Sequence, residues 1–339
     1  MTTMVNWGVL GTARIAEQQV IPATTRSTNG RVLGVSSGNR RARAFAQRLG
    51  IPRAYPSHDA LLADPEIDAV YIPLPNALHS QWTISAAQAG KHILCEKPVA
   101  LTPDELTKME TACRNAGVQL AEGFMYRHHP QIDRVRELLT DGRIGDIRAV
   151  EARFHFLMDI TSGTDIRLDE TLGGGALRDV GCYPIDLMNL LLGGPPAEVA
   201  AVSSLRDGVG VETAVAAVLR YDGVMGTFSC GFESPAMDHC TILGSEGSIQ
   251  LRHPFRPDAN GGTGVIVVSA GSRSETIEVD GDSYQSEVED FARRIIDNAP
   301  DTEGMRLSRW TVETTHRVAQ AARLPATRPL PSSTTAPHR

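Results

Sequence analysis

The chain has 339 residues, enough for two domains that each bury a core. Hydrophobic residues make up 41% and charged residues 22%, as in ordinary globular proteins. The formal net charge of −7 favours neither nucleic acid nor an anionic membrane as a partner, and no apolar run reaches the ~20 residues of a membrane span.

The amino terminus and the cysteines indicate the compartment. No basic segment followed by an apolar one opens the chain, so we expect no signal peptide. The five cysteines are scattered and lack the spacing of a metal site. We therefore expect reduced thiols, a cytoplasmic protein and no bound metal.

The first predicted strand, residues 5–10, leads directly into a small-residue turn. The turn reads Gly11-Thr12-Ala13-Arg14-Ile15-Ala16. It follows the dinucleotide-binding pattern G-x-G-x-x-G with alanine in the second and third glycine places. Gly11 permits the tight turn, Ala13 allows close approach of a pyrophosphate, and the N–H groups at the helix start can bind its phosphates. A turn without a ligand is the alternative, but its place at the first strand–helix junction favours a phosphate site.

Strands and helices then alternate up to residue 124. Further strands are predicted at 31–36, 69–72, 92–95 and 119–122, and helices at 40–49, 77–89 and 103–115. The segment Thr102-Pro103-Asp104-Glu105 is a capping box that marks a helix start. This alternation predicts parallel βαβ units in a doubly wound sheet, within a domain spanning residues 1–124.

The end of the second strand indicates the cofactor. An acidic residue there would bind an adenosine ribose and favour NAD. The sequence instead reads Ser36-Ser37-Gly38-Asn39-Arg40-Arg41. Hydroxyl, amide and guanidinium groups at Ser37, Asn39 and Arg40 suit a 2′-phosphate. We therefore expect NADP, with NAD as the alternative.

Two later turns end strands at the same predicted edge, where parallel sheets bind their ligands. Leu74-Pro75-Asn76 follows one strand, and His79 comes in the next helical turn, as a polar contact near the nicotinamide or as a buried structural residue. Glu96-Lys97-Pro98 follows the strand at residues 92–95. A partly desolvated lysine at such a place is suited to proton transfer.

The second half contains one polar stripe on an otherwise apolar helix. After a helix at 130–140 and a strand at 148–156, the run Gly173-Gly174-Gly175 leads into residues 176–192. If these residues are helical, Asp179, Tyr183 and Asp186 share a face. The glycines before them indicate close approach to another group, and a solvated face is the alternative for the stripe.

From residue 197 the pattern changes to strands. They are predicted at 197–204, 213–221, 224–230, 239–244, 248–252, 265–270 and 275–279. Asp222-Gly223 between two alternating runs predicts a two-residue hairpin. With closing helices at 286–298 and 307–322, residues 125–324 form an α+β domain with a large, mostly antiparallel open sheet. Residues 325–339 form a predicted flexible tail.

Taken together, these motifs resemble the glucose–fructose oxidoreductase and inositol dehydrogenase (Gfo/Idh/MocA) family. The matching segments are residues 8–16, 74–79, Glu96-Lys97-Pro98, 124–130 and 173–183. The resemblance implies an N-terminal Rossmann domain, a C-terminal α/β domain with an open sheet, and homodimers or homotetramers formed through that sheet.

The resemblance also implies roles for individual residues. Lys97 matches the family lysine that hydrogen-bonds the reacting hydroxyl near the nicotinamide, and the Lys97-Pro98 bond matches one that is often cis. Asp179 matches an acidic substrate-site residue, and Arg167 a position near cofactor or substrate. Tyr183 stands where inositol dehydrogenases usually carry histidine, which resembles the branch of NADP-dependent xylose dehydrogenase, glucose–fructose oxidoreductase and dihydrodiol dehydrogenase.

We therefore expect an NADP-dependent oxidoreductase that acts on a sugar or cyclic polyol, with an aldose such as xylose foremost. Tyr183 would be the acid/base, assisted by Lys97, with Asp179 binding sugar hydroxyls. A phenol ordinarily ionises near pH ~10, so base catalysis by tyrosine needs a nearby cation. A nucleotide-sugar ketoreductase and a non-catalytic NADP-sensing regulator on the same fold are the alternatives.

Overall fold

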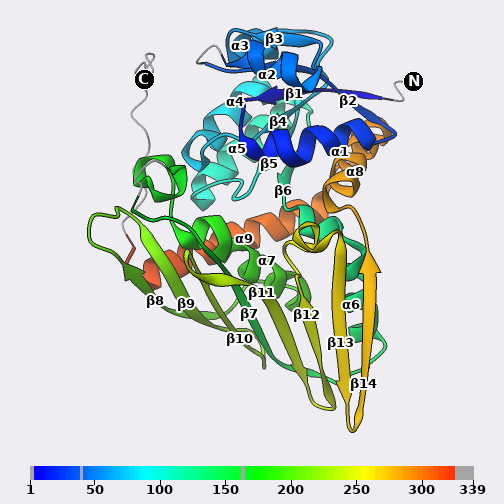
Figure 1. The fold of residues 1–339 in the computed structure, drawn as a ribbon, viewed down its shortest axis with the longest axis vertical. Helices are drawn as coiled ribbons and strands as arrows, with labels where there is room; N and C mark the ends of the chain where they lie inside the picture. The colour runs from blue at the N-terminus through cyan, green and yellow to red at the C-terminus, as the bar shows by residue number, and fades with distance from the viewer. Residues whose placement is uncertain (1–3, 39–40, 162–164, 325–339) are drawn as a thin grey trace. The chain divides into compact units, whose positions relative to one another are not determined.

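The computed structural model describes residues 4–38, 41–161 and 165–324 (Figure 1). Contacts between Cα atoms divide them into two compact units. The first comprises the chain up to Gly123 together with the returning segment Tyr284–Met305, and the second comprises Phe124–Ser283 and residues 306–324. The sequence assigned residues 284–305 to the second domain, whereas the structure places them in the first unit.

A six-stranded parallel sheet forms the first unit, in the order β3-β2-β1-β4-β5-β6. Its strands are β1 (Val5–Leu10), β2 (Gly30–Ser36), β3 (Arg53–Tyr55), β4 (Ala69–Ile72), β5 (His92–Glu96) and β6 (Leu120–Gly123). The strand order reverses between β1 and β4, as the predicted doubly wound sheet requires. In such sheets the ligand crevice lies outside the carboxyl ends of the strands at this reversal.

Helices complete the first unit. They are α1 (Ile21–Arg26), α2 (Ala42–Leu49), α3 (His58–Leu62), α4 (His79–Gln88) and α5 (Pro103–Ala116). Helices α4 and α5 pack against each other (Figure 1). The predicted capping box opens α5: the Thr102 hydroxyl accepts from the Glu105 N–H at 3.2 Å, and the Glu105 carboxylate accepts from the Leu101 N–H at 2.9 Å.

The returning helix α8 (Ser283–Asp297) belongs to the first unit because it packs on β1. The Phe291 ring lies 5.7 Å from the buried Trp7 ring between centroids. The Gln119 amide also donates to the Arg294 carbonyl at 2.9 Å. Sequence patterns do not reveal such a return, since the contacts join residues far apart in the chain.

An eight-stranded, mostly antiparallel sheet forms the second unit, in the order β14-β13-β12-β11-β7-β10-β9-β8. Its strands are β7 (Ile147–Leu157), β8 (Glu198–Leu205), β9 (Glu212–Arg220), β10 (Met225–Gly231), β11 (Glu233–Gly244), β12 (Gly247–Arg252), β13 (Thr263–Ala270) and β14 (Arg273–Asp280). The predicted Asp222-Gly223 hairpin joins β9 and β10. Only the β7–β10 pair is parallel among the described strands of this sheet.

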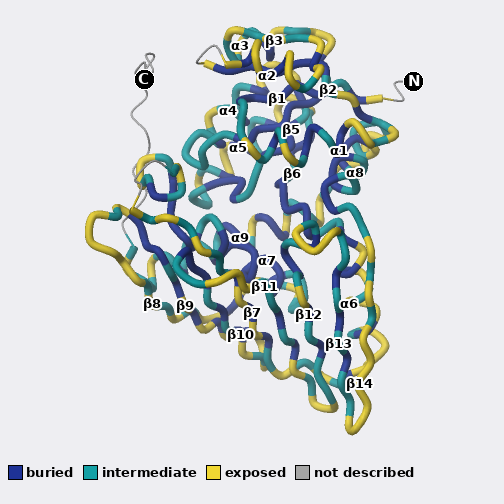
Figure 2. The backbone as a smooth tube through the Cα atoms, in the orientation of Figure 1, coloured by how far each residue is buried: buried dark blue, intermediate teal, exposed yellow. Residues whose placement is uncertain are grey.

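The two faces of this sheet differ in burial. Along β7, Val150, Ala152 and Phe154 are buried, while Glu151 and Arg153 between them are exposed. Figure 2 shows buried, intermediate and exposed segments interspersed along the strands of this sheet. The buried face belongs to a core shared with α6 (Pro130–Thr140), α7 (Cys182–Leu192) and α9 (Thr302–Ala321). This alternation is that of a sheet covered by helices on one side.

A fully buried carboxylate, that of Asp186, ties α7 to two other segments. The Arg127 guanidinium donates to both of its oxygens, and the Tyr126 phenol donates to Oδ2. The Thr311 hydroxyl of α9 donates to Oδ1 at 2.8 Å. Asp186 therefore does not lie on a solvated helix face, because its charge is paired and hydrogen-bonded inside the unit.

None of the helices in the described residues is long and apolar enough to cross a membrane.

We predict that Asp186→Ala lowers the free energy of unfolding of the second unit by about 3–5 kcal/mol, because it leaves the Arg127 charge buried without its partner. The matched control is Glu137→Ala, which removes the exposed ion pair to Arg134 on α6 and should change stability by less than ~1 kcal/mol. Urea denaturation followed by circular dichroism measures both. Equal midpoints for the two variants would contradict this role for Asp186.

Candidate active site

The turn after β1 has the geometry that close approach of a phosphate needs. Gly11 has φ +114°, and its N–H donates to the Ser36 carbonyl at 2.8 Å. A side chain here would be strained and would lie 3.1 Å from the Leu74 methyl. Thr12 and Ala13 are half-buried, Arg14 is exposed, and the chain turns helical at Arg14 and Ile15. The backbone from residue 11 to 15 thus forms a small-residue cradle at the carboxyl end of β1.

The helix after this cradle opens differently from the expected α-helix. Residues Ala16–Val20 (η1) form a π-helical turn before α1 begins. Ala16 is fully buried, as predicted for a residue that lets the helix pack closely on the sheet.

The end of β2 is buried and hydrogen-bonded to His58, the first residue of α3. Ser36 and Ser37 have 0% and 4% of their surface exposed. The Ser36 hydroxyl lies 2.7 Å from His58 Nδ1, and the His58 ring meets the edge of Trp82 at 4.6 Å between centroids. Asn39 and Arg40, the other expected phosphate contacts, lie outside the described residues.

His79 links the turns after β4 and β5. Its ring is fully buried, with Nε2 2.8 Å from the Leu74 carbonyl and Nδ1 2.9 Å from the Pro98 carbonyl. Burial lowers its pKa, and so does the charge of Lys97. The two backbone carbonyls beside the ring nitrogens act on this pKa in the opposite direction and raise it. His79 thus contacts the backbone of the turns after β4 and β5. Pro75 and Asn76 are half-buried and belong to the turn after β4.

Lys97 follows β5 and is held by its neighbours. Lys97 is half-buried and begins a cis peptide bond to Pro98. The Glu96 carboxylate accepts from the Tyr71 phenol at 2.5 Å and from the Lys97 N–H at 3.3 Å. The buried Glu122 carboxylate accepts from the Val99 N–H at 2.8 Å. Two carboxylates thus fix the backbone on both sides of Lys97.

These four turns follow β1, β2, β4 and β5, which are adjacent in the sheet. The structure therefore brings the described residues among the predicted cofactor contacts of the first unit to one carboxyl edge, where a doubly wound sheet binds its ligand. In the described part of the chain, no cluster of His, Cys, Asp and Glu could hold a metal ion.

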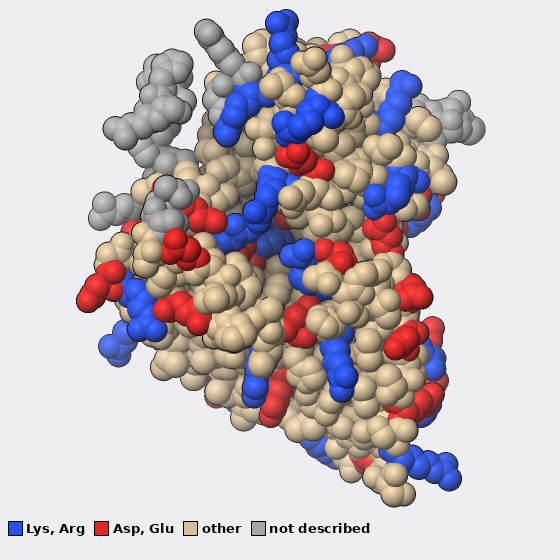
Figure 3. Space-filling model, in the orientation of Figure 1, with Lys and Arg blue, Asp and Glu red and all other residues tan. Residues whose placement is uncertain are grey.

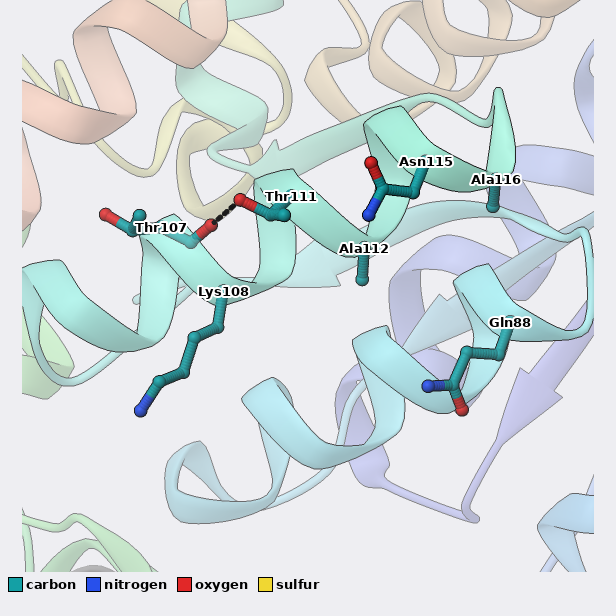
Figure 4. A pocket seen from close by; sticks show the side chains of 7 residues that line it. All are labelled: Gln88, Thr107, Lys108, Thr111, Ala112, Asn115 and Ala116. Carbon is teal, nitrogen blue, oxygen red and sulfur yellow. Dashed lines mark hydrogen bonds between the residues drawn. The ribbon is translucent and has the colours of Figure 1, made fainter.

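A groove elsewhere in the first unit carries no such chemistry. It has a volume of about 540 Å³ and lies between α4 and α5, lined by Gln88, Thr107, Lys108, Thr111 and Asn115 among others (Figure 4). Lys108 is the only charged group in its lining and pairs with Asp104. The groove reaches the carboxyl ends of both helices, which is the opposite edge from Lys97.

In the second unit, Asp179 and Arg167 form an ion pair. Arg167 Nε donates to Asp179 Oδ2 at 2.8 Å, and its Nη1 lies 3.3 Å from Asp165 Oδ1. The Asp179 charge raises the pKa of Arg167. Arg167 comes from the short turn Ile166–Leu168 (η4), so this turn and the helix that carries Asp179 are joined by charge.

Tyr183 lies in an aromatic enclosure. It is 5% exposed, and its ring lies 5.1–5.6 Å between centroids from those of Phe124, Phe154 and Phe255. The phenol points to the sulfur of Met125, with O and S 3.8 Å apart. Such an enclosure excludes water from a phenol and holds its ring in one orientation.

The helix that carries these residues is not a continuous α-helix. Leu177–Gly181 (η6) is a π-helical segment that continues into α7. The three side chains that were predicted to share one helix face, those of Asp179, Tyr183 and Asp186, have different partners in the structure. Asp179 meets Arg167, Tyr183 meets aromatic rings, and Asp186 is a buried structural residue.

Comparison with known proteins identifies the family. Residues 5–124 match the family model described as an oxidoreductase family with an NAD-binding Rossmann fold, and residues 132–250 match that of the GFO/IDH/MocA C-terminal domain. The chain therefore belongs to the GFO/IDH/MocA oxidoreductase family, which confirms the predicted resemblance and fold class.

Several relatives are similar over most of the chain. The D-xylose 1-dehydrogenase (NADP(+)) 2 of Haloferax volcanii is 39% identical over 85% of this chain and 88% of its own. The dTDP-3,4-didehydro-2,6-dideoxy-alpha-D-glucose 3-reductase of Streptomyces violaceoruber is 38% identical over 74% of each chain. A 3-ketoreductase from Actinomadura kijaniata, solved with NADP and TDP-benzene, has a TM-score of 0.88 and 30% identity over 94% of this chain and 98% of its own.

Burial of His58 predicts a pH effect on the first unit. Burial lowers the pKa of His58 to about 4, whereas an unfolded histidine titrates near ~6.5. The unfolded chain then binds the proton more tightly, so stability is lost as the pH falls from about 6.5 toward 4. We expect the thermal midpoint to fall less steeply over this interval in His58→Asn than in the wild type. Other buried histidines are the same in both proteins, and parallel midpoint curves would rule out the effect.

Proposed function

We propose that the protein is an NADP-dependent oxidoreductase that transfers a hydride between the nicotinamide and the hydroxyl-bearing carbon of a sugar or cyclic polyol, with an aldose such as xylose foremost. The single observation that carries this proposal is the 39% identity to an NADP-dependent xylose dehydrogenase. The place of Lys97 at the carboxyl edge of the sheet agrees with it. The buried Tyr183 phenol supplies the second proton-transferring group.

The residues present fit a dinucleotide. At Gly11, φ is +114° and any side chain would contact Leu74, so this turn leaves its backbone open to a pyrophosphate. Ser37 lies at the end of β2 with no acid beside it in residues 36–41, which suits a 2′-phosphate. When bound, the cofactor supplies the acceptor or donor of the hydride.

Proton transfer falls to Tyr183 and Lys97. The Tyr183 phenolate takes the hydroxyl proton during oxidation, and the phenol returns it during reduction. Lys97 assists in this proposal by donating a hydrogen bond from its ammonium group to the substrate hydroxyl, which favours loss of the hydroxyl proton. The aromatic enclosure holds the Tyr183 ring, and the Glu96 and Glu122 carboxylates hold the backbone of Lys97 and Val99.

The Arg167–Asp179 pair binds the sugar. Asp179 accepts hydrogen bonds from substrate hydroxyls, and Arg167 holds the carboxylate in one orientation. An isolated Asp179 charge would oppose ionisation of a neighbouring phenol, and the guanidinium offsets that charge.

A nucleotide-sugar ketoreductase is the second candidate. The reductase relative at 38% identity and the ketoreductase structure solved with TDP-benzene favour it. A non-catalytic NADP sensor is the third, but such a protein needs neither Lys97 nor Tyr183.

A substrate panel separates the three candidates. Absorbance of the reduced nicotinamide is followed with NADP and with NAD over free aldoses, cyclic diols, inositols and a nucleotide-linked keto-sugar. We expect turnover of a free aldose and a lower KM for NADP than for NAD. Turnover of the nucleotide-linked sugar alone would identify a ketoreductase. NADP binding without turnover of any compound would identify a sensor.

We predict that Lys97→Met and Tyr183→Phe each lower kcat by about 10²–10⁴-fold, because each removes a group that moves or stabilises the proton. NADP affinity, measured by fluorescence titration, should remain in Tyr183→Phe. The matched controls are Lys108→Met, an exposed lysine on α5, and Tyr221→Phe, a buried tyrosine bonded to Asn189. Near-normal turnover in Lys97→Met or Tyr183→Phe would end the catalytic assignment.

We also propose that the protein is a cytoplasmic homodimer or homotetramer whose subunits meet through the outer face of the eight-stranded sheet. Four large apolar side chains on that face are exposed, at 69% for Val202, 44% for Val218, 43% for Met225 and 38% for Leu243. Water exposure of this many apolar groups on neighbouring strands is typical of a subunit contact. All five cysteines are free and buried, which suits a reducing compartment.

We predict that Val218→Arg shifts the protein to a smaller species, because it places a charge in that contact without entering the core. Light scattering after size-exclusion chromatography measures the mass. The matched control is Gln88→Arg, at an exposed position on α4. Charged side chains of both signs are scattered over the face of the molecule that Figure 3 shows, so one more exposed arginine should be tolerated. An unchanged mass in Val218→Arg, or a monomeric wild type, would refute the contact.

A further inference from the structure

Another buried carboxylate, that of Glu212, lies at the start of the helix that carries Asp179 and Tyr183. Glu212 is the first residue of β9 and is 4% exposed. Its Oε1 accepts a hydrogen bond from the Leu177 N–H at 3.0 Å. A strand residue distant in sequence therefore caps the first turn of the helix, in place of a local capping side chain, which Ala176 cannot provide.

The glycines before the helix make room for this contact. A Cβ at Gly175 would lie 2.4 Å from Glu212 Oε1 and 2.6 Å from Oε2, and φ there is +111°. A Cβ at Gly174 would lie 2.4 Å from the Arg167 carbonyl. The glycine run was predicted to approach another group closely. In the structure, Gly175 approaches the Glu212 carboxylate, and Gly174 approaches the backbone of the turn that carries Arg167.

A buried carboxylate needs compensation, and here it faces the positive end of a helix. Burial raises the pKa of Glu212, while the Leu177 N–H, its own N–H and the Arg178 charge lower it. The other titratable group against it is the Cys230 thiol on β10, whose pKa rises through burial and the Glu212 charge. Placing an acid in this position is unfavourable for stability alone, compared with an apolar residue beside a locally capped helix.

The helix is also fixed beyond its first turn. A Cβ at Gly181 would lie 2.9 Å from Cys230 Sγ, so the π-helical segment packs directly on β10. Asp186 is fixed three residues after Tyr183 by Arg127 and Thr311. Glu212 therefore holds the helix before Asp179 and Tyr183, and the Asp186 ion pair holds it after them.

We propose that Glu212 is a positioning residue that sets the first turn of this helix and thereby aligns Asp179 and Tyr183 for substrate. The inference rests on the proposed function, because it assigns Glu212 to the alignment of the residues that function uses. Glu212 touches neither substrate nor cofactor, so its removal acts on kcat through orientation, with cofactor affinity unchanged.

The test compares three substitutions with a control on the same helix. In Glu212→Ala we expect kcat to fall about 10- to 100-fold with KM for NADP within about twofold of wild type. Glu212→Gln keeps an acceptor oxygen at full length and should restore most of kcat. Glu212→Asp keeps the charge but withdraws the oxygen from Leu177, so it should resemble Glu212→Ala.

The control is Asn189→Ala, which removes a buried polar contact to Tyr221 at the far end of α7. It should lower the thermal midpoint as much as Glu212→Ala but leave kcat per folded protein within about twofold of wild type. If Glu212→Ala does not fold, the Gln and Asp variants decide the question between them.

Two outcomes would overturn the inference: wild-type kcat in every Glu212 variant that folds, or a loss of kcat no larger than that of Asn189→Ala. The Tyr183→Phe variant distinguishes failure of the positioning role of Glu212 from failure of the proposed function. If Tyr183→Phe is inactive and Glu212→Ala is active, only the positioning role fails. If Tyr183→Phe is active, the proposed function itself fails.

Discussion

The buried ion pair between Asp186 and Arg127 is the interaction on which the second unit depends. It gathers α7, the segment after β6 and α9 around one carboxylate that has no exposed surface. A charge in this place is tolerated only while every oxygen has a donor, so the three segments are held in a single arrangement. Tyr183 lies three residues before Asp186 and is held by the same arrangement. The Phe124 ring packs against the Tyr183 ring, and the Arg127 guanidinium lies 4.5 Å from the centroid of the Phe124 ring.

Around Tyr183 the chain departs from regular geometry. The helix widens into a π turn, glycine at 175 takes a backbone conformation that other residues avoid, and Gly181 brings the helix against Cys230. Such departures persist where surrounding contacts over-determine them, and they concentrate at functional sites. Here those contacts are the Glu212 carboxylate at one end and the Asp186 ion pair at the other. On this helix, Asp179 pairs with Arg167, and the Tyr183 ring lies among aromatic rings.

In the first unit, buried side chains hold the turns at the carboxyl edge of the sheet. The turns after β4 and β5 have no regular hydrogen-bond ladder, yet they must present Lys97 in one place. His79 joins the two turns through their carbonyls, while the carboxylates of Glu96 and Glu122 accept from backbone N–H groups on either side of the cis proline. Polar side chains of this edge thus hold the backbone of the turns that the sequence predicted to bind the cofactor.

The sequence by itself determined the features that depend on neighbouring residues. The capping box at Thr102, the Asp222-Gly223 hairpin and the Gly11 turn could be predicted, because each arises from local backbone and side-chain geometry. The alternation of strands and helices in the first unit was also predicted, except for β3 and α3, which were missed. The sequence also identified the family from motifs in order. Only the tertiary structure decided that α8 returns to the first unit, that Asp186 is paired rather than solvated, and that Glu212 meets Gly175. These contacts join residues tens to hundreds of positions apart, and no periodicity or turn signal records which distant partner a buried charge will find.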